Sequence, residues 1–549
     1  MKAKRNVTLA LSIAAIFTTG YVHALDLTPV PNANAKVTGM AAPNILSPEL
    51  METIVARGSM RLENPTAAIA FYGYDNNGTM LPTDPSSLKE ASKTEPDKNV
   101  YLVLPGQQGA DAGYHYGERF LFQGHEMGTQ GYATRINLDA DVAHRVTLLA
   151  DADVNGNPLP TFDGITWNPF ANRLLLTAEK GNAGGVWQVS AEFNPASTAT
   201  AEDISGALGR GGYEGIQNDG DGNIWIVEDA GGKSGITAKH AKQPNSFIYR
   251  FVPNDKTDLT KGGKLQALQV MSLVTGQPIE FHAGQADADI LSQDMKDLHT
   301  YGKTFNTKWV TLHDTDVDGN APFDANAMAK TRHATPFKRS ENAQFRPGSD
   351  FREFFFDETG DTNLLTEAPD HGGFGAVLKL VQKSSSANEG KLSMFYKGDA
   401  VHSGFDNVAF WSKDKLVFVE DAGDTLHTQR NAFDSAYMFN VNADYSDGKQ
   451  PMRILALGRD ASATIDSWLG SFASGFQNDG DNEITGIHVS DGDPTADGLL
   501  GAKSPRPFKD GWRVFYTQQH GDNQTFEILP ANGQDKDFDD EGEYHGHRR

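Results

Sequence analysis

The chain has 549 residues, no cysteine and a formal net charge of -24. The lack of cysteine excludes disulfides, thiolate metal ligands and a cysteine nucleophile, so any metal must be held by oxygen or imidazole ligands. The negative charge repels nucleic acid and anionic lipid and attracts cations, so we expect no nucleic-acid partner and no membrane partner. Exported proteins are also often acidic for solubility. Charge alone therefore does not decide between a protein that binds cations and one whose acidity only keeps it soluble.

The first 24 residues have the pattern of a secretory signal peptide. Lys2, Lys4 and Arg5 precede an apolar stretch over 7–17, and a cleavage-like end follows at 22–24. The apolar stretch is too short to cross a membrane, and no later segment is long and apolar enough to do so. We therefore expect a mature protein that is periplasmic or extracellular.

Residues 25–98 are predicted to form an N-terminal strap or cover, because Pro and Gly interrupt them too often for a separate core. Within this strap, Ser47 followed by PELMETIVARG is typical of a capped helix. At the other end of the chain, residues 531–549 lack apolar side chains and are predicted to be a disordered tail.

Within residues 99–530 a degenerate phrase recurs about five times, with copies that open on Asp163, Glu214, Glu341, Asp406 and Glu483. Each copy opens on an acidic residue, passes through alternating apolar residues and a Gly/Asp/Asn turn into an apolar strand, and closes on an acidic or amide cluster. Such repeated units of short strands are typical of a β-propeller. The sequence therefore predicts an all-β, six-bladed β-propeller with the N-terminal strap and a partly helical insertion. The blades are expected from Tyr101 onward and over 163–190, 214–253, 341–382, 406–442 and 483–530.

The predicted insertion, residues 254–340, contains a stretch that resembles a calcium loop. Asp314, Asp316 and Asp318, followed by Gly319, have the spacing that turns alternate oxygens toward one point. We therefore predict these three aspartates as calcium ligands, although Ala325 stands where a calcium loop has a bidentate glutamate. The same residues can instead form turns that hydrogen-bond to the backbone, and both interpretations stay open.

Several segments of the repeat region occur in an order that matches a known family. They are GHEMGTQGY (124–132), GITWNPFANRLLLTAEK (164–180), YEGIQNDGDGNIWIVED (213–229), KRSEN (338–342), and the closing pair TGIHVSDGD and FYTQQHGDN. In this order they resemble the PhoX family of secreted alkaline phosphatases, over about residues 100–530. The resemblance implies a six-bladed propeller whose channel holds iron and calcium ions, and hydrolysis of phosphate monoesters.

The resemblance also implies roles for four residues. Glu179, Glu214 and Glu341 fall on acidic metal ligands of the family, and Arg339 falls on an arginine that grips the phosphate. These residue types suit the chemistry, because carboxylates hold hard cations and a guanidinium neutralises phosphoryl oxygens. Equivalent blade positions project to one end of a propeller channel, so we expect the three glutamates to converge there. Arg339 and Glu341 are the expected catalytic residues.

The chain departs from the family pattern at several of these positions. The family's metal-bridging cysteine has no counterpart, Tyr213 replaces a histidine, and Ser340 and Asn342 alter the R-P-E-D motif. Calcium is therefore the expected metal, and iron is less favoured. Two functions stay open: a metal-dependent hydrolase of phosphate monoesters, and a noncatalytic calcium-binding propeller that recognises a partner. A lactonase-type propeller with one calcium is a weaker third interpretation.

Overall fold

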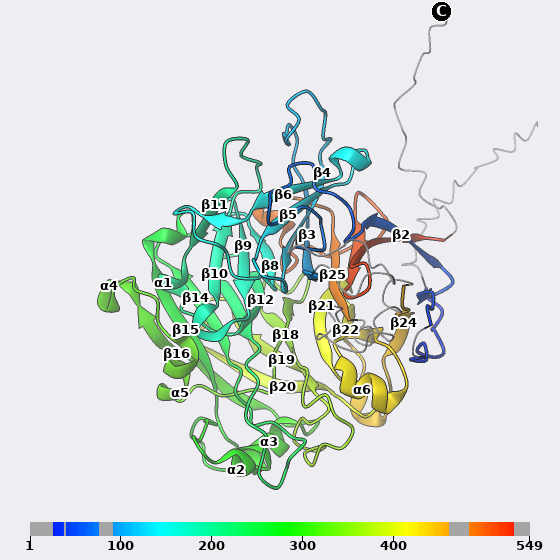
Figure 1. The fold of residues 1–549 in the computed structure, drawn as a ribbon. Helices are drawn as coiled ribbons and strands as arrows, with labels where there is room; N and C mark the ends of the chain where they lie inside the picture. The colour runs from blue at the N-terminus through cyan, green and yellow to red at the C-terminus, as the bar shows by residue number, and fades with distance from the viewer. Residues whose placement is uncertain (1–25, 38–39, 76–91, 461–482, 532–549) are drawn as a thin grey trace, which may run out of the picture.

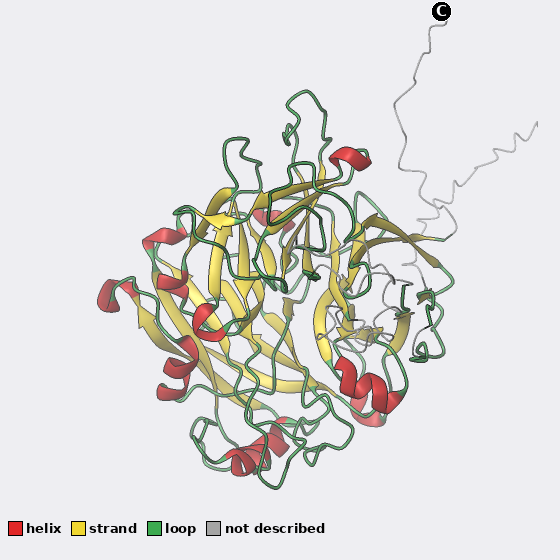
Figure 2. Cartoon of the chain, in the orientation of Figure 1, coloured by secondary structure: helices red, strands yellow, loops and turns green. Residues whose placement is uncertain are grey.

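The computed structural model describes residues 26–37, 40–75, 92–460 and 483–531 (Figure 1). These residues form mainly antiparallel strands, with short helices at the periphery (Figure 2). The predicted signal peptide and all but the first residue of the predicted tail lie outside the described residues. No helix in the described part of the chain is long and apolar enough to cross a membrane.

The described strands form six units of four antiparallel strands, which confirms the predicted six-bladed propeller. Blades one to three consist of β3 (Pro96–Val103), β4 (Arg119–His125), β5 (Ala133–Asn137), β6 (Val146–Ala150); β8 (Ile165–Asn168), β9 (Arg173–Ala178), β10 (Gly185–Val189), β11 (Ala199–Asp203); and β12 (Tyr213–Asn218), β13 (Ile224–Glu228), β14 (Ile248–Pro253), β15 (Gly263–Val270). Blades four to six consist of β17 (Ala343–Phe345), β18 (Glu353–Glu358), β19 (Ala376–Gln382), β20 (Glu389–Lys397); β21 (Phe405–Ser412), β22 (Lys415–Glu420), β23 (Ser435–Asn440), β24 (Met452–Ala456); and β25 (Ile484–Ser490), β26 (Arg513–Gln518), β27 (Gln524–Pro530), β2 (Leu50–Ala56).

Three further strands extend the blades. The short strands β1 (Ile45–Leu46) and β7 (Ala152–Asp153) add to the outer edges of blades five and two. The longer β16 (Phe305–Asp314) pairs with β15 on one side and β20 on the other, so blades three and four form one nine-stranded sheet.

The segment predicted as an insertion, residues 254–340, therefore contributes two sheet strands, β15 and β16, as well as helices. The helices within it lie at the periphery in Figure 1. The α-helices of the described chain are α1 (Ser205–Leu208), α2 (Ala286–Ile290), α3 (Gln293–Leu298), α4 (Thr315–Asp318), α5 (Ala325–Thr331) and α6 (Gly423–Arg430). Single turns of 3-10 helix occur at Val142–His144, Gly181–Ala183, Leu259–Lys261, Tyr445–Asp447 and Ala496–Gly498.

The N-terminal region closes the ring of blades, because β2 pairs with β27 as the outermost strand of blade six. The helix predicted after Ser47 is wrong, since this segment forms β2. The Ser47 backbone N–H donates to the Ile454 carbonyl instead of the serine capping a helix. The β-branched run Thr53, Ile54 and Val55 favours a strand, and the free edge of β27 provides its partner.

The hydrophobic core is divided among the contacts between neighbouring blades. Six large clusters of buried apolar side chains in the described residues each join one blade to the next around the ring. Trp225 of blade three, for example, packs against Phe345 and Phe354 of blade four. Since each blade is covered on both faces, its strands are apolar on both sides. The innermost strands β3, β8, β12, β17, β21 and β25 contact one another in ring order and surround a central channel.

Candidate metal centre

Each blade places an acidic residue within two positions of the start of its innermost strand. In blade order these residues are Asp97, Asp163, Glu214, Glu341, Asp406 and Glu483. The blades repeat the same strand order around the channel, so all six starts lie at the same end of it. Five of the six residues are buried, and Glu483 is half-buried.

The second strand of each blade runs back antiparallel and ends beside these starts. In four blades the next residue is acidic: Glu126, Glu179, Asp229 and Asp421. Blades four and six have Thr359 and Gln519 there, and the Thr359 N–H donates to the Arg339 carbonyl at 2.8 Å. The ten carboxyl groups from the two sets of positions are called the channel ring below.

Three of these side chains lie where the strand pairing is irregular. The register of blades one, three and five shifts between Pro96 and Asn99, between Tyr213 and Ile216, and between Phe405 and Val408. These bulges contain Asp97, Glu214 and Asp406, respectively. Bulges are common next to active sites because the extra residue changes the direction of a side chain.

Glycines after two of the acids allow neighbouring innermost strands to approach closely. A Cβ at Gly164 would lie 2.0 Å from the Glu214 carbonyl oxygen, and one at Gly215 would lie 2.8 Å from the Glu341 carbonyl oxygen. The Gly215 N–H donates to that same Glu341 carbonyl at 2.8 Å. The Asp-Gly and Glu-Gly pairs in the repeat therefore bring acids of adjacent blades together.

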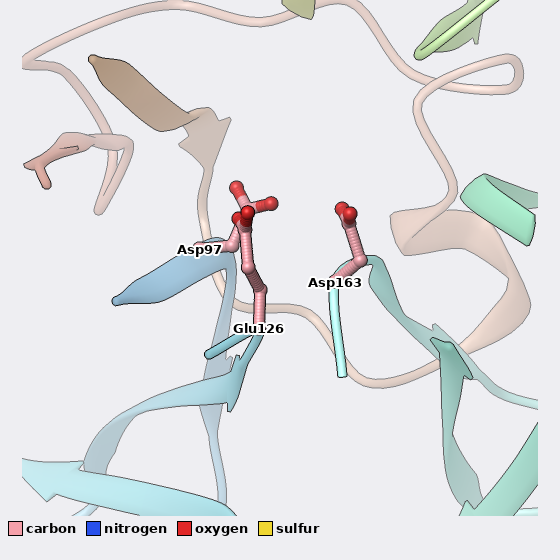
Figure 3. A group of neighbouring side chains, drawn as sticks. All are labelled: Asp97, Glu126 and Asp163. Carbon is pink, nitrogen blue, oxygen red and sulfur yellow. The ribbon is translucent and has the colours of Figure 1, made fainter. Parts of the chain in front are cut away.

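Two groups of three carboxyl groups are close enough to share an ion. One consists of Asp97, Glu126 and Asp163, and the other of Glu214, Glu341 and Asp406. Within each group, one oxygen from every residue lies within 4.8 Å of the others. Since calcium–oxygen distances are about 2.3–2.6 Å, three oxygens at this spacing can contact one calcium ion. Figure 3 shows Asp97 and Glu126 side by side, facing Asp163.

Unpartnered buried oxygens show that the ring suits a cation. Asp97 Oδ1, Asp163 Oδ1, Asp229 Oδ1 and Asp406 Oδ2 have no hydrogen-bond partner in the described structure. Burying a carboxylate oxygen without a partner costs free energy of folding. A hard divalent cation bound to that oxygen removes this cost. The donor set, which contains only oxygens, fits calcium better than a metal that prefers thiolates.

The pKa values follow from the same crowding. Burial raises the pKa of Glu214 and Glu341 well above their usual range, and carboxylates nearby, including Asp406, raise it further. For Glu341 the Arg339 charge opposes this shift. Burial raises the pKa of Asp406 to about 7. Without a cation, these carboxyl groups therefore hold their protons to higher pH than exposed carboxyl groups do.

Arg339 lies at the half-buried rim of the ring. Its guanidinium donates to Asp229 Oδ2 at 2.9 and 3.0 Å and to Glu341 Oε1 at 2.6 Å. Burial lowers its pKa, but Asp229, Glu341 and Asp421 outweigh this and keep the pKa well above its usual value. Its backbone is in the left-handed region, at φ 59°, which is costly for a non-glycine residue and common at functional sites.

The structure brings together some of the residues predicted from the sequence. Glu214 and Glu341 belong to one three-carboxyl group, and Arg339 contacts Glu341. Glu179 is a half-buried member of the ring that belongs to neither three-carboxyl group. Burial raises its pKa, and the charges of Asp229 and Asp163 raise it further.

Asp314, Asp316 and Asp318 lie elsewhere, on the outer strand β16 and the single turn α4 (Figure 1). Asp314 accepts from the Asp316 N–H at 3.2 Å and pairs with Lys264 at 2.9 Å. Asp318 accepts from the Asp314 N–H at 2.9 Å. These contacts match the interpretation as a hydrogen-bonded turn, and the calcium assignment of this loop stays a prediction.

The sequence-based list of ligands missed Asp97, Glu126, Asp163 and Asp406. Asp163 and Asp406 open copies of the repeat, so equivalence with Glu214 and Glu341 was the signal that could have identified them. Glu126 lies in the segment GHEMGTQGY that carries the family resemblance, and that segment was the signal for it. Asp97 is harder to find, because the sequence predicts that the first blade starts at Tyr101, whereas β3 starts at Pro96.

Comparisons with known proteins agree with this architecture. A family model described as alkaline phosphatase PhoX matches residues 190–496. The structure of Pseudomonas fluorescens PhoX in complex with vanadate, a transition state analogue, is 12% identical with a TM-score of 0.52, and the match covers 92% of this chain and 98% of that chain.

Other solved structures are more distant. A Trichoderma reesei carbohydrate-active enzyme of family AA12 is 10% identical (TM-score 0.30; 91% of this chain and 100% of that chain). The aldose sugar dehydrogenase of Escherichia coli is 14% identical (TM-score 0.27; 69% and 98%). No curated protein matches the chain. The family match covers more than half of the sequence, and the chain belongs to the PhoX family of alkaline phosphatases.

Proposed function

We propose that this protein is a calcium-dependent hydrolase of phosphate monoesters that acts at the acidic end of its propeller channel. Membership of the PhoX family makes it a phosphatase-like hydrolase. The observation that carries the proposal is the convergence of carboxyl groups from five of the six blades in two close groups, one of which contacts a half-buried arginine. The predicted signal peptide supports action in the periplasm or outside the cell.

The two three-carboxyl groups are the proposed metal ligands. Asp97, Glu126 and Asp163 would hold one calcium ion, and Glu214, Glu341 and Asp406 a second. A cation bound there would supply Lewis acidity to the phosphoryl group. An all-oxygen donor set supports calcium over iron.

Arg339 is the proposed phosphate-binding residue. Its planar guanidinium can bind two oxygens of a phosphoryl group and neutralise the charge that these oxygens carry as the ester bond breaks. Asp229 and Glu341 hold the guanidinium at the rim, and this fixes its direction before substrate arrives. Glu341 thereby joins the phosphate-binding residue to the metal ligands, which is why we propose it as the second catalytic residue.

Protons compete with calcium for the same carboxyl oxygens. Because burial raises the pKa of Asp406 to about 7 and that of Glu341 well above its usual value, calcium affinity should rise with pH. We therefore expect the hydrolase to work best under alkaline conditions.

The direct test is an assay of the mature protein with an aryl phosphate and with phytate. It is run with added calcium, with added iron, and after chelation. We expect turnover with calcium at alkaline pH and its loss on chelation. Folded, calcium-loaded protein that turns over neither substrate in any condition would favour a noncatalytic calcium-binding propeller that recognises a partner.

A further inference from the structure

The strained backbone of Arg339 belongs to a turn that occurs in more than one blade. The Arg339 carbonyl accepts from the Thr359 N–H at 2.8 Å, and at the equivalent place in blade five the Gly404 carbonyl accepts from the Asp421 N–H at 2.8 Å. Both residues are in the left-handed region, Arg339 at φ 59° and Gly404 at φ 70°. Glycine adopts this conformation without strain, whereas arginine does so at a cost in free energy. Blade four therefore carries strain that a glycine would avoid.

Such strain persists only where the surrounding contacts fix the conformation. Here the contacts come from the end of β18 and the residues that follow it. The Lys338 N–H donates to Glu358 Oε1 at 2.8 Å, and the Lys338 carbonyl accepts from the Gly360 N–H at 3.2 Å. Together with the bond from Thr359 to Arg339, these hydrogen bonds attach two consecutive backbone units to one short segment.

The Lys338 side chain adds a buried ion pair with Asp361. Its Nζ lies 3.0 and 3.1 Å from the two carboxylate oxygens, and the two side chains are 1% and 0% exposed. The same carboxylate accepts from the Thr366 hydroxyl at 2.7 Å and from the Lys242 N–H at 2.9 Å. Asp361 therefore joins the residue before Arg339 to two other segments of the chain. Loss of either partner would leave an uncompensated buried charge, so this arrangement is firmly held.

A histidine that follows α3 holds the second oxygen of Glu358. His299 Nε2 lies 2.5 Å from Glu358 Oε2, and both side chains are fully buried. His299 Nδ1 lies 2.6 Å from the Met295 carbonyl oxygen, which can only accept, so Nδ1 carries a hydrogen and the ring orientation is fixed. The partly helical segment 254–340 thus reaches the Lys338 backbone through one carboxyl group.

We propose that Lys338, Asp361 and Glu358 are positioning residues for Arg339. They hold its backbone in the left-handed conformation, so that the guanidinium lies at the rim of the channel ring before a phosphate ester binds. A group fixed in advance loses less conformational freedom on binding, so loosening it weakens phosphate binding without removing a metal ligand. The inference rests on the proposed function, because it takes Arg339 as the phosphate-binding residue.

The test is the variant Lys338→Met in the calcium-loaded mature protein. It keeps most of the side chain but removes the ammonium, and we expect kcat/KM for an aryl phosphate to fall about 10- to 100-fold. Calorimetric titration with inorganic phosphate should show weaker binding, while calcium content stays that of the wild type. In an Arg339→Ala background the same change should lower kcat/KM less than about twofold, because Lys338 acts through the missing side chain.

Arg513→Met is the matched control. It breaks another buried ion pair, in which Arg513 Nη2 lies 2.5 Å from Glu527 Oε2, at the end of blade six that is remote from the channel ring. This control should lower the melting temperature but leave kcat/KM and phosphate affinity unchanged. A loss of the same size in the control and in Lys338→Met would show a general effect of destabilisation and overturn the inference.

A second variant covers the case in which Lys338→Met does not fold. Asp361→Asn keeps the shape of the side chain and an acceptor oxygen but removes the negative charge, and we expect kcat/KM to fall at least about threefold. This loss should also shrink in the Arg339→Ala background. Undiminished loss in that background, or no loss in either folded variant, would overturn the inference.

The outcomes separate this inference from the proposed function. Wild-type protein that hydrolyses no phosphate ester, or whose turnover does not depend on Arg339, overturns both. Wild-type turnover that depends on Arg339, combined with unchanged kcat/KM in Lys338→Met and Asp361→Asn, overturns the positioning role alone.

Discussion

The molecule has two acidic regions that look very different in sequence and in structure. The loop from Asp314 to Asp318 is a dense local motif, whereas the channel ring collects single acids from positions far apart in the chain. In the loop, Lys264 lowers the pKa of Asp314 through a hydrogen bond. In the ring, burial raises the pKa of Glu214 and its neighbours. Buried carboxyl groups that the fold crowds together without partners are therefore a stronger candidate for a metal site than a local run of acids at the surface.

The free energies point the same way. The pair of Asp314 with Lys264 lies at the surface, where water screens both charges, so a cation at the loop would relieve no desolvation cost. A buried polar group without a partner costs about 1–3 kcal/mol, and more when it is charged. A cation in the ring relieves several such costs together.

The largest expected effect is that of removing one ring carboxylate. Glu214→Gln should lose bound calcium and lower phosphatase turnover by about 100-fold or more, because it removes one of three ligands of a cation. The control is Asp316→Asn in the loop, which makes the same chemical change at an exposed site. Calcium content and turnover of both variants check the prediction. Equal losses of calcium and turnover in the two variants would contradict the claim that the ring, and not the loop, is the metal site.

Removing the rim arginine should separate substrate binding from metal binding. Arg339→Ala should reduce turnover about 100- to 1,000-fold, because the phosphoryl oxygens lose their guanidinium partner. Calcium content should stay close to that of the wild type. Loss of calcium together with activity would mean that Arg339 acts mainly by holding Glu341 in place.

The metal-free protein should become less stable as pH rises. In the fold, burial raises the pKa of Asp406 to about 7, whereas an unfolded aspartate titrates near about 3.9. The folded state keeps the proton to higher pH, so this contribution is fully present below about pH 4 and is lost as pH rises through 7. Other ring carboxyl groups with raised pKa values, such as Asp163, act in the same direction.

Calorimetry of chelated protein measures this effect. We expect the melting temperature to fall by several degrees between pH 5 and pH 8, and saturating calcium to abolish the fall. Chelated protein that is more stable at pH 8 than at pH 5 would contradict the assignment of buried, partnerless carboxyl groups to the ring.

The smallest effect is expected in the loop. Asp314→Asn keeps a capping oxygen for α4 but weakens the pair with Lys264, and because water screens that pair the free energy of unfolding should hardly change. Denaturant unfolding with and without calcium provides the measurement. A calcium-dependent loss of stability in this variant would instead indicate that the loop binds calcium, as its spacing predicts.

Much of the fold could be predicted because the repeat is local. Alternation and turn residues within each copy located the innermost strands of blades two to six close to where they begin. The role of β2 could not be found in this way, because its partner β27 lies at the other end of the chain. Likewise β16 joins blades three and four through pairing that no local pattern shows.

The candidate site was predicted less completely than the fold. Glu214, Glu341 and Arg339 followed from the family resemblance, and the structure places them beside one another. Asp97 could not be found, because it lies in a bulge of β3 before the point where the sequence predicts the first blade to start. Irregular pairing at the channel decides which side chains meet, and periodicity does not predict such irregularities.

The most direct test of the central claim is to locate the ions in crystals of the mature protein grown with calcium and with terbium in its place. Anomalous scattering gives their positions. We predict ions about 2.3–2.6 Å from the carboxyl oxygens of Asp97, Glu126 and Asp163 and from those of Glu214, Glu341 and Asp406. Ions bound only at Asp314 to Asp318, with none in the channel, would contradict the account.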